Sequence, residues 1–350
     1  MEGSLVIDMT NKSRLALITA PIGGHRLEYL QSLSPDLQIE QRPARSTEAL
    51  QDALWQEAEI LYTSFATPLP LPEQAPRLRW VQLYSAGPDR ILDHPLVQSP
   101  VIFTTTSGIH AINMAEHVLA MMLAWLHRLP RLLSYQQRGQ WPTPSERSSS
   151  FVPEELRGKT IGIVGYGSVG RQVARLATAL GMRVLAMHRS TDHRDYGFQF
   201  PDIGDPEGTL PSRYYALDQL HSMLSESDVI VIAVPLTPRT RNLFDEAAFQ
   251  AMKSTAFLVN VARGEVCNET ALVHALEEKQ IAGAALDVFH QEPLPPDHPL
   301  WHLPNVFISP HTAGLSSLYD ERAAMLFEEN LRRYLVGEPL YNIVDKAQGY

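Results

Sequence analysis

Three glycines, Gly165, Gly167 and Gly170, form the pattern G-x-G-x-x-G between an apolar stretch, TIGIV, and a helix-like stretch, RQVARLATAL. In a strand–turn–helix unit, the first glycine allows the tight turn, the second lets the backbone approach a pyrophosphate, and the third lets the helix pack on the strand. The helix N-terminus, which begins at Ser168 and Val169, has unpaired N–H groups that attract an anion. The pattern predicts a dinucleotide-binding turn.

The next strand-like stretch of this unit, RVLAM, runs directly into His188, Arg189 and Ser190. A carboxylate at the position of His188 would accept hydrogen bonds from the ribose hydroxyls and repel a 2′-phosphate. This chain has no acid there. Arg189 can form a forked pair with a phosphate, Ser190 adds a hydroxyl donor, and His188 can donate or stack near the adenine. These residues predict a preference for NADP(H), with NAD(H) also possible, whereas the alternative is an exposed loop without a ligand.

The stretch that follows, residues 191–215, is rich in Asp, Gly and Pro. Loops of this length are uncommon inside a compact domain. Two interpretations stay open, a surface excursion and a flap beside the adenosine end of the cofactor.

The elements that must position these groups alternate between strand-like and helix-like stretches, which predicts parallel βαβ units and an α/β fold. Buried strands are predicted near residues 15–20, 58–64, 79–84 and 101–106, and helices at 47–56 and from 113, the latter broken near Pro130. A polar loop is predicted at 142–159. The alternation then restarts and predicts a doubly wound sheet with strands near 160–167, 183–187, 228–236, 255–261, 282–289 and 305–310. The amphipathic helix at 314–338 is expected to return to the first domain, because the inner sheet is already complete.

Composition limits the classes of function. The chain has 350 residues, enough for about two domains, and 44% of them are hydrophobic, which suffices for sizeable cores. Its formal net charge of −10 argues against non-specific nucleic-acid binding and against docking on an anionic membrane. The most apolar run, 118–126, is too short to span a bilayer, and we see no secretory signal. Cys267 is the single cysteine, so no internal disulfide forms, and we expect a cytoplasmic protein without a metal site.

Three later motifs, VARG, ALDVFHQEP and SPHTAG, contain Arg263, Glu292 and His311. Together with the glycine turn and AVPLTPRTRNLF, they resemble the signatures of the D-isomer-specific 2-hydroxyacid dehydrogenase family, in the family's order and approximate spacing. The resemblance extends from about residue 61 to the final helix, and its nearest type is a glyoxylate or hydroxypyruvate reductase.

The resemblance implies that Arg263, Glu292 and His311 are a catalytic trio. Hydride transfer from nicotinamide to a 2-keto acid leaves an alkoxide, to which His311 can give a proton near neutral pH. Glu292 would orient the His311 ring through a hydrogen bond. Arg263 would bind the substrate carboxylate and polarise the keto oxygen. Any one of these residues alone would be read as a surface or loop group, so it is their convergence behind a dinucleotide turn that favours an active site.

The same resemblance assigns further positions. The backbone N–H groups of Ser85, Ala86 and Gly87 would hold the substrate carboxylate, and Leu61, Tyr62 and Phe65 are candidates for the side-chain pocket. Val234 and Pro235 would line the adenine side, Val261 and Ala262 would border the nicotinamide, and Asp287 would face its carboxamide. The other implied cofactor contacts are Arg263, His311 and Gly314. Glu116 and His117 are typical of the family's interdomain helix, where we expect a structural role.

Two departures from the family pattern stand out. Asn268 in the sequence CNE replaces a carboxylate outside the trio, with little effect on chemistry expected. Pro88 in YSAGPD removes one backbone donor from the substrate loop.

The resemblance and the order of elements together predict two Rossmann-like doubly wound parallel-sheet domains, with the active site in the cleft between them. Residues 1–110 and 315–350 are expected to form a flavodoxin-like substrate domain, into which an NAD(P)-binding domain, residues 111–314, is inserted. A homodimer through the long helix at 113–133 is the expectation for the family.

The leading hypothesis is an NADP-preferring reductase that converts a small 2-keto acid, of the glyoxylate or hydroxypyruvate type, to the D-2-hydroxy acid. A phosphoglycerate dehydrogenase-like enzyme and a formate or phosphite dehydrogenase are less favoured alternatives. A hypothesis from another class is a dinucleotide-sensing protein, similar to the corepressors that share this fold and retain the trio.

Overall fold

The computed structural model describes residues 13–42 and 52–349. The chain divides into two compact units. Unit 1 contains the described residues up to Ile109, together with Tyr196–Phe200 and the segment from Ser316 onward. Unit 2 contains His110–Asp195 and Pro201–Leu315. No helix among the described residues is both long and apolar enough to cross a membrane.

Unit 1 is built on a five-stranded parallel sheet with the strand order β2-β1-β3-β4-β5, the flavodoxin-like order. Its strands are β1 (Arg14–Ile18), β2 (Leu37–Gln41), β3 (Ala58–Thr63), β4 (Trp80–Leu83) and β5 (Ile102–Thr104). One face packs on α1 (Gly24–Ser32) and α10 (Tyr319–Val336) through a core that includes Tyr62 and Phe327, whose rings stack. The other face packs on α2 (Asp52–Glu57) and the loops around it. Both faces are therefore covered, as a parallel sheet requires.

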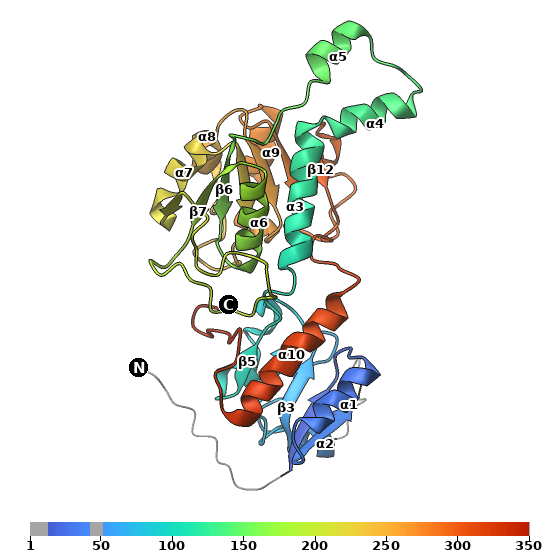
Figure 1. The fold of residues 1–350 in the computed structure, drawn as a ribbon, viewed down its shortest axis with the longest axis vertical. Helices are drawn as coiled ribbons and strands as arrows, with labels where there is room; N and C mark the ends of the chain where they lie inside the picture. Colours follow the sequence, from blue (N-terminus) through green and yellow to red (C-terminus); the bar gives the residue numbers. More distant parts are fainter. Residues whose placement is uncertain (1–12, 43–51, 350) are drawn as a thin grey trace. The chain divides into compact units, whose positions relative to one another are not determined.

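Unit 2 contains a seven-stranded parallel sheet with the order β12-β11-β10-β9-β6-β7-β8 (Figure 1). Its strands are β6 (Thr160–Val164), β7 (Arg183–Met187), β8 (Arg213–Tyr215), β9 (Val229–Ile232), β10 (Phe257–Asn260), β11 (Gly283–Leu286) and β12 (Val306–Ile308). One face packs on α3 (Ala111–Leu126) and α6 (Ser168–Ala179). The other packs on α7 (Leu220–Glu226), α8 (Glu246–Ala251) and α9 (Glu269–Glu277). The strand order reverses at β6, as in a Rossmann fold, so the predicted fold class is confirmed.

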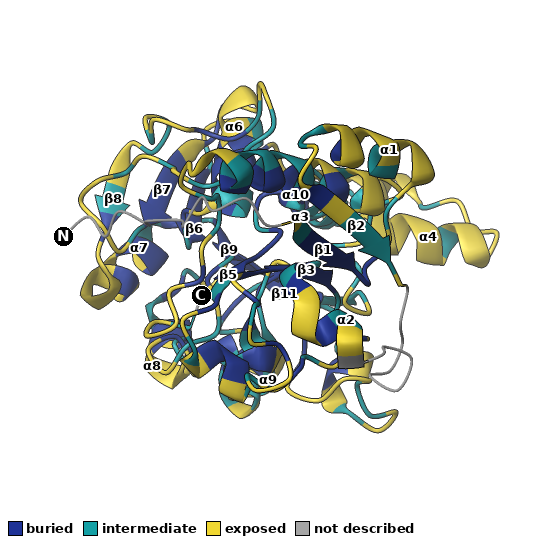
Figure 2. Ribbon diagram, turned by 90° about the horizontal axis from the view of Figure 1, so that it is seen from below, coloured by how far each residue is buried: buried dark blue, intermediate teal, exposed yellow. Residues whose placement is uncertain are grey.

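The burial pattern follows the layers, with dark blue strands inside and yellow outer surfaces on helices such as α1 and α4 (Figure 2). Short 3₁₀ helices lie at Asp89–Ile91, Pro95–Gln98, Leu217–Gln219, Gly264–Val266 and Pro299–His302. They cap strand ends and loops without adding to the sheets.

Two local features differ from the sequence predictions. Strand β2 was not expected, because LQIEQ is too polar to be recognised outside its sheet. Residues 142–159 are not all loop, since α5 (Pro144–Ser150) forms there with a capping box between Thr143 and Glu146. That box satisfies N–H groups at both positions, and Pro144 favours the first helical turn. The predicted helix at 47–56 lies partly outside the described residues.

The predicted break near Pro130 is confirmed. Helix α3 ends at Leu126, Arg128 has a φ of 56°, and α4 (Leu129–Gln137) begins with Pro130 in its first turn. The left-handed residue redirects the chain, and proline starts the new helix because its missing N–H is not needed there.

The stretch 191–215 also differs from a simple loop. Its last residues form strand β8, which pairs in parallel with Leu185–Met187 of β7. Its segment Tyr196–Phe200 belongs to unit 1. We call residues 191–212, which precede β8, the insert.

Candidate functional site

The glycine turn after β6 has the geometry that its spacing predicts. Gly165 has a φ of 104°, and a Cβ there would lie 2.7 Å from the backbone of Ala233. A Cβ on Gly170 would lie 2.2 Å from the carbonyl oxygen of Gly165. A Cβ on Gly167 would meet no described atom within 4 Å. The fold itself therefore requires the first and third glycines, whereas the space in front of the second is open.

Helix α6 begins in this open space. Its N-cap, Gly167, has an ordinary φ of −87°, and no side chain caps the helix or places an acid in its first turn. The first N–H groups of a helix, here those of Ser168 and Val169, have no partner within the helix. The turn therefore presents an uncapped positive helix end, which suits a pyrophosphate.

At the end of β7, His188 occupies the position beside this turn. Its N–H donates to the Tyr215 carbonyl at 3.1 Å, and its Nδ1 lies 3.0 Å from the Ser190 carbonyl oxygen. Arg189 and Ser190 are exposed. Burial lowers the pKa of His188 from its ordinary value, and the positive charges of Arg171 and Arg189 act in the same direction. Basic and hydroxyl groups thus directly follow the strand, and the first carboxylate after them is Asp192, whose N–H donates to the Ser190 hydroxyl at 3.0 Å.

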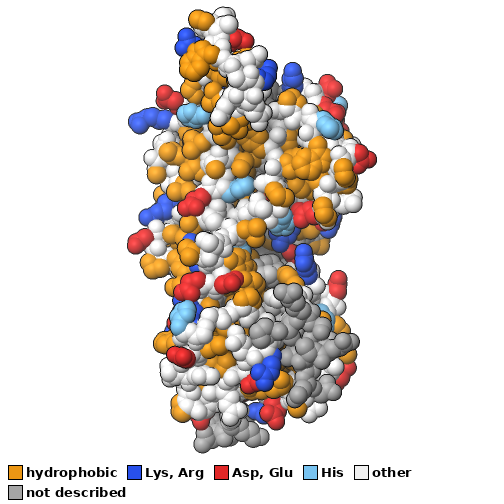
Figure 3. Space-filling view, turned by 90° about the vertical axis from the view of Figure 1, so that its right-hand side faces the viewer, with side chains coloured by type: hydrophobic (Ala, Val, Ile, Leu, Met, Phe, Trp, Pro, Cys, Tyr) orange, Lys and Arg blue, Asp and Glu red, His pale blue; other side chains and the backbone are white. Residues whose placement is uncertain are grey.

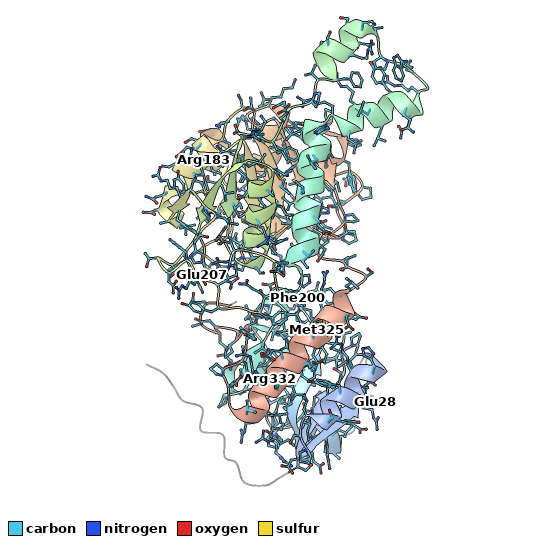
Figure 4. The ribbon with its side chains drawn as sticks, in the orientation of Figure 1. Glu28, Arg183, Phe200, Glu207, Met325 and Arg332 are labelled. Carbon is cyan, nitrogen blue, oxygen red and sulfur yellow. The ribbon has the colours of Figure 1, made fainter. Side chains whose placement is uncertain are left out.

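The insert is held firmly against the glycine turn and α6. The buried guanidinium of Arg171 donates to the carbonyl of Asp205 at 2.6 Å and to that of His193 at 2.7 Å. Tyr166, inside the glycine turn, donates its hydroxyl to Asp205 at 2.7 Å. Figure 4 labels Arg183 at the start of β7 and Glu207 of the insert beyond the other end of that strand. The insert is thus anchored at the carboxyl edge of the sheet.

His311 and Glu292, 19 residues apart in sequence, form a direct hydrogen bond. His311 Nδ1 lies 2.7 Å from Glu292 Oε2. Because a carboxylate can only accept, the proton of this bond belongs to Nδ1, which leaves Nε2 for another partner. Glu292 is itself oriented by the N–H of Phe289, 3.1 Å from Oε1. Both side chains are exposed enough, at 49% and 37%, for His311 to reach a ligand.

Asp287 holds the loop that carries His311. Its carboxylate is buried and accepts hydrogen bonds from the N–H groups of Thr312 and Ala313, both at 2.9 Å, and from the Ser309 hydroxyl. The N–H of His311 donates to the Asp287 carbonyl at 2.9 Å. These bonds stabilise the left-handed backbone of His311, whose φ is 54°. The predicted contact of Asp287 with a carboxamide stays a prediction.

Helix α3 supports the same loop. Asn113 donates to the carbonyls of Ala313 and Leu315, at 2.7 and 3.3 Å. His117 Nε2 lies 3.3 Å from the Ser309 hydroxyl, so its structural role extends to this loop, whereas Glu116 is exposed. Sequence reasoning did not identify the roles of Asn113 and Ser309, because each depends on a partner far along the chain.

Arg263 follows the end of β10. Its Nη1 donates to the Ala262 carbonyl at 2.8 Å, and its own carbonyl accepts from Asn260 at 3.1 Å. A Cβ on Gly264 would lie 2.1 Å from the Phe289 carbonyl carbon, so glycine lets this loop touch the loop that leads to Glu292. The loops of Arg263, Glu292 and His311 thus follow β10, β11 and β12 at one edge of the sheet.

The remaining predicted cofactor residues lie at this same edge. Val234 and Pro235 follow β9, and Val261 and Ala262 follow β10. Val234, Val261 and Ala262 are buried, and Pro235 is exposed. Gly314 follows the His311 loop, and a Cβ there would lie 3.3 Å from the His110 ring. Ligands of open α/β sheets bind beyond the carboxyl ends of the strands, which is where unit 2 places all of these residues.

The predicted substrate loop belongs to unit 1. Within the described residues, the N–H groups of Ser85, Ala86 and Gly87 donate to no protein group. The Ser85 hydroxyl donates to the Gly87 carbonyl at 3.0 Å, and Pro88 is buried at the start of a 3₁₀ helix. Three neighbouring N–H groups without protein acceptors suit an anion.

Two residues of the predicted side-chain pocket are misassigned. Leu61 and Tyr62 have no exposed surface and lie in the cores on the two faces of the unit 1 sheet, since neighbouring strand residues alternate in direction. Phe65 is 36% exposed, with the Arg90 guanidinium over its ring.

The departure at Asn268 has a structural explanation. Asn268 caps α9 by accepting a hydrogen bond from the N–H of Ala271 at 3.0 Å, a task that Asn and Asp perform equally well. Cys267 beside it is buried, which raises the pKa of its thiol to about 12 and leaves it unreactive.

Comparisons with known proteins agree with this architecture. A sequence profile described as D-isomer specific 2-hydroxyacid dehydrogenase, NAD binding domain, matches residues 119–313. The glyoxylate reductase of Aeropyrum pernix is 36% identical over 83% of this chain and 84% of that protein. A family protein from Aeromonas salmonicida superposes with a TM-score of 0.78 at 32% identity, over 96% of this chain and 100% of that one. A D-isomer specific 2-hydroxyacid dehydrogenase from Xanthobacter autotrophicus, solved with NADPH and MES, gives 0.76 at 28% identity, over 97% and 100%.

Proposed function

Because this chain belongs to the D-isomer-specific 2-hydroxyacid dehydrogenase family, we propose that it reduces a small 2-keto acid of the glyoxylate or hydroxypyruvate type, with NADPH preferred and NADH accepted. The observation that carries the proposal is the hydrogen bond of 2.7 Å between His311 and Glu292 at the sheet edge where the glycine turn opens. In this assignment unit 2 binds the dinucleotide, and unit 1 contributes substrate contacts.

The chemistry requires one hydride and one proton. Reduced nicotinamide, when bound, supplies the hydride to the carbonyl carbon. The carbonyl oxygen then becomes an alkoxide, and the protonated His311 ring donates Nε2–H to it. Nδ1–H continues to donate to Glu292, so the ring keeps its orientation before and after the transfer.

The substrate carboxylate needs positive partners. The Arg263 guanidinium supplies paired N–H donors for a carboxylate and for the keto oxygen. The N–H groups of Ser85, Ala86 and Gly87 supply further donors from unit 1. Together they would select 2-keto acids over simple ketones.

The preference for NADPH rests on the end of β7. An acid that would repel a 2′-phosphate is absent at His188, while Arg189 and Ser190 are exposed beside it. The similar protein from Xanthobacter autotrophicus was solved with NADPH, which supports the same choice.

The decisive experiment is turnover of NADPH and NADH with a panel of keto acids, including glyoxylate, hydroxypyruvate and a phosphorylated keto acid. We expect His311→Ala to lower kcat by roughly 10²- to 10⁴-fold while dinucleotide binding persists. His274→Ala, on the exposed face of α9, is the matched control and should retain full activity.

Other outcomes identify the alternatives. Tight NADPH binding without turnover of any keto acid would favour a dinucleotide-sensing protein. A strong preference for the phosphorylated keto acid would favour a phosphoglycerate dehydrogenase-like enzyme.

We propose that the chain forms a homodimer through the helical region at 113–133, together with the exposed apolar residues of α4 that continue it. Leu129, Leu132 and Leu133 are 43–47% exposed, and Trp141 is 85% exposed. Figure 3 shows hydrophobic side chains among charged ones at this upper end of the molecule. Apolar side chains gathered on one helix, rather than scattered singly, are typical of a contact surface. Sedimentation velocity should give a dimer for the natural chain and a shift toward monomer for Leu132→Glu.

A further inference from the structure

The insert brings a second histidine to the position beside Arg189 and Ser190. His193 Nδ1 lies 3.4 Å from His188 Nδ1, and the two rings meet edge to face with centroids 5.6 Å apart. Nothing in the sequence pattern singles out His193, because its role depends on how the insert folds back onto β7.

The position of His193 is fixed from three sides. Its ring stacks on Tyr214 of β8, with centroids 3.5 Å apart and planes inclined by 9°. Its carbonyl accepts from Arg171 of α6 at 2.7 Å. The same carbonyl lies so close to Gly208, whose φ is 67°, that a Cβ there would approach it to 2.3 Å. The contact between the two histidines is thus built into the fold.

The hydrogen-bond partners determine where protons lie in this pair. The Ser190 carbonyl can only accept, so His188 Nδ1 carries a hydrogen and donates to it at 3.0 Å. Two N–H groups cannot point at one another, so His193 Nδ1 presents a lone pair. Both rings are then neutral, and the nitrogen that can take a further proton without breaking this contact is His188 Nε2.

The surroundings disfavour that additional proton in the free protein. The charged groups acting on His188 are Arg171 from α6, Arg189 beside it and, when protonated, His193 from the insert, all of them positive. Tyr214 from β8 contributes a ring face to His193. The acids of the insert near the pair engage other groups. Asp192, whose N–H donates to the Ser190 hydroxyl, accepts from the N–H of Arg194 at 3.1 Å. Asp195 pairs with Arg171 at 3.4 Å, and Asp205 accepts from Tyr166. Burial and these cations lower the pKa of His188.

We propose that His188, held against the lone pair of His193, lies beside the 2′-phosphate of NADP(H), so that binding of this phosphate is accompanied by uptake of one proton by this pair. The inference rests on the proposed function, because it places the phosphate at Arg189 and Ser190. The phosphate adds negative charge beside Arg171, Arg189 and the two histidines, and it thereby stabilises the protonated pair. NAD(H), which has a ribose hydroxyl instead, leaves the pair neutral.

The sign of the pH dependence follows from linkage. The pair takes up its proton at a lower pH in the free protein than in the phosphate complex. Between these two values NADP⁺ affinity falls as pH rises, by up to about tenfold per pH unit, and below both it is constant. The second ionisation of the phosphate, near pH 6, acts in the opposite direction but is the same for every variant.

The test is calorimetric titration of the full chain with NADP⁺ and NAD⁺ at pH 7.5, in two buffers of different ionisation enthalpy. For the natural chain we expect uptake of roughly half to one proton with NADP⁺ and none with NAD⁺. The NADP⁺/NAD⁺ affinity ratio should fall about tenfold between pH 6.5 and 8.5. His188→Gln should abolish the uptake, and His193→Phe, which preserves the stack on Tyr214 but removes the accepting lone pair, should reduce it. An unfolding midpoint equal to that of the natural chain shows that each variant is folded. His221→Gln, on the exposed side of α7, should behave as the natural chain.

Two results overturn the proposal in distinguishable ways. If NADP⁺ binds more strongly than NAD⁺ but without proton uptake, the proposal for the histidine pair is wrong and the proposed function stands. The same holds if both histidine variants show the same uptake as the natural chain. NADP⁺ binding no stronger than NAD⁺ binding removes both the pair and the proposed cofactor preference.

Discussion

In each unit, one strand is followed by a glycine and then a helix: β1 by Gly23 and α1 in unit 1, and β6 by the glycine turn and α6 in unit 2. Only the turn of unit 2 suits a phosphate. In unit 2 the chain passes from β6 directly through Gly165 into α6, whose first turn has no acid. In unit 1 a longer loop from β1 reaches Gly23 before α1, beside a cavity of about 680 Å³ that Asp320 and Glu321 help to line. Topology creates an opening at both switch points, but the glycine spacing and the charge of the lining determine what can enter.

The two acids at the unit 1 opening already have protein partners. Asp320 accepts a hydrogen bond from the Tyr84 hydroxyl, and Glu321 pairs with Arg26 of α1. They stabilise the packing of α10 in unit 1 and would repel an anion. The comparison therefore separates an opening used for packing from one left available to a ligand.

The largest effect is expected from Gly165→Ala. The substitution forces a left-handed backbone on alanine and places its Cβ 2.7 Å from the Ala233 backbone. We expect a loss of at least about 2 kcal/mol in the free energy of unfolding, measured by denaturant titration. An unchanged unfolding midpoint would show that the turn accommodates a side chain and that the fold does not require glycine at this position.

Gly167→Ala should separate ligand binding from stability. Its Cβ meets no described atom within 4 Å, so the stability should stay within about 0.5 kcal/mol of the natural chain. NADPH affinity, followed by fluorescence, should fall tenfold or more because the methyl group occupies the pyrophosphate's approach. Gly23→Ala, the matched change in unit 1, should leave NADPH affinity unchanged. Equal effects of the two substitutions would contradict the distinction between the openings.

Arg189→Ala should weaken NADPH by about tenfold, the scale of one charge-assisted contact, and leave NADH nearly unchanged. Arg183→Ala, at the other end of β7, removes a surface charge paired with Glu226 and is the control. If both nucleotides lose affinity equally in Arg189→Ala, the phosphate contact lies elsewhere.

The smallest effect is expected from Glu321→Gln. The hydrogen bond and charge of Arg26 lower the pKa of Glu321, so this pair stabilises unit 1 above that pKa and ceases to do so as acid protonates the carboxylate. Surface pairs contribute about 0.2–1 kcal/mol, so the unfolding midpoint should shift slightly at pH 7 and not at all well below pH 4. A gain of NADPH affinity in this variant would place a nucleotide contact in unit 1.

Features that depend on nearby residues could be predicted from the sequence, whereas features that depend on distant partners could not. The glycine turn was predictable because the role of each glycine depends on residues close to it in the same strand–turn–helix unit. Strand β2 was not, because its polar sequence becomes a strand only through pairing with β1. The capping box of α5 was readable in TPSE but was outweighed by the surrounding serines and proline.

Leu61 and Tyr62 show the opposite error. Their apolar character was correctly taken as strand-forming, but only the packing of α10 on the sheet shows that Tyr62 stacks on Phe327 in a closed core. A sequence indicates that a residue is buried more readily than it indicates what covers it.

The sequence by itself determined the alternation of strands and helices, the turn at Gly165 to Gly170 and the three motifs that contain Arg263, Glu292 and His311, because these depend on local periodicity and spacing. Only the tertiary structure decided which partners meet across the chain. Asp287 and Asn113 hold the His311 loop, and the insert returns His193 to His188. Such contacts join residues that no spacing rule connects, because each is fixed by the packing of whole elements against one another.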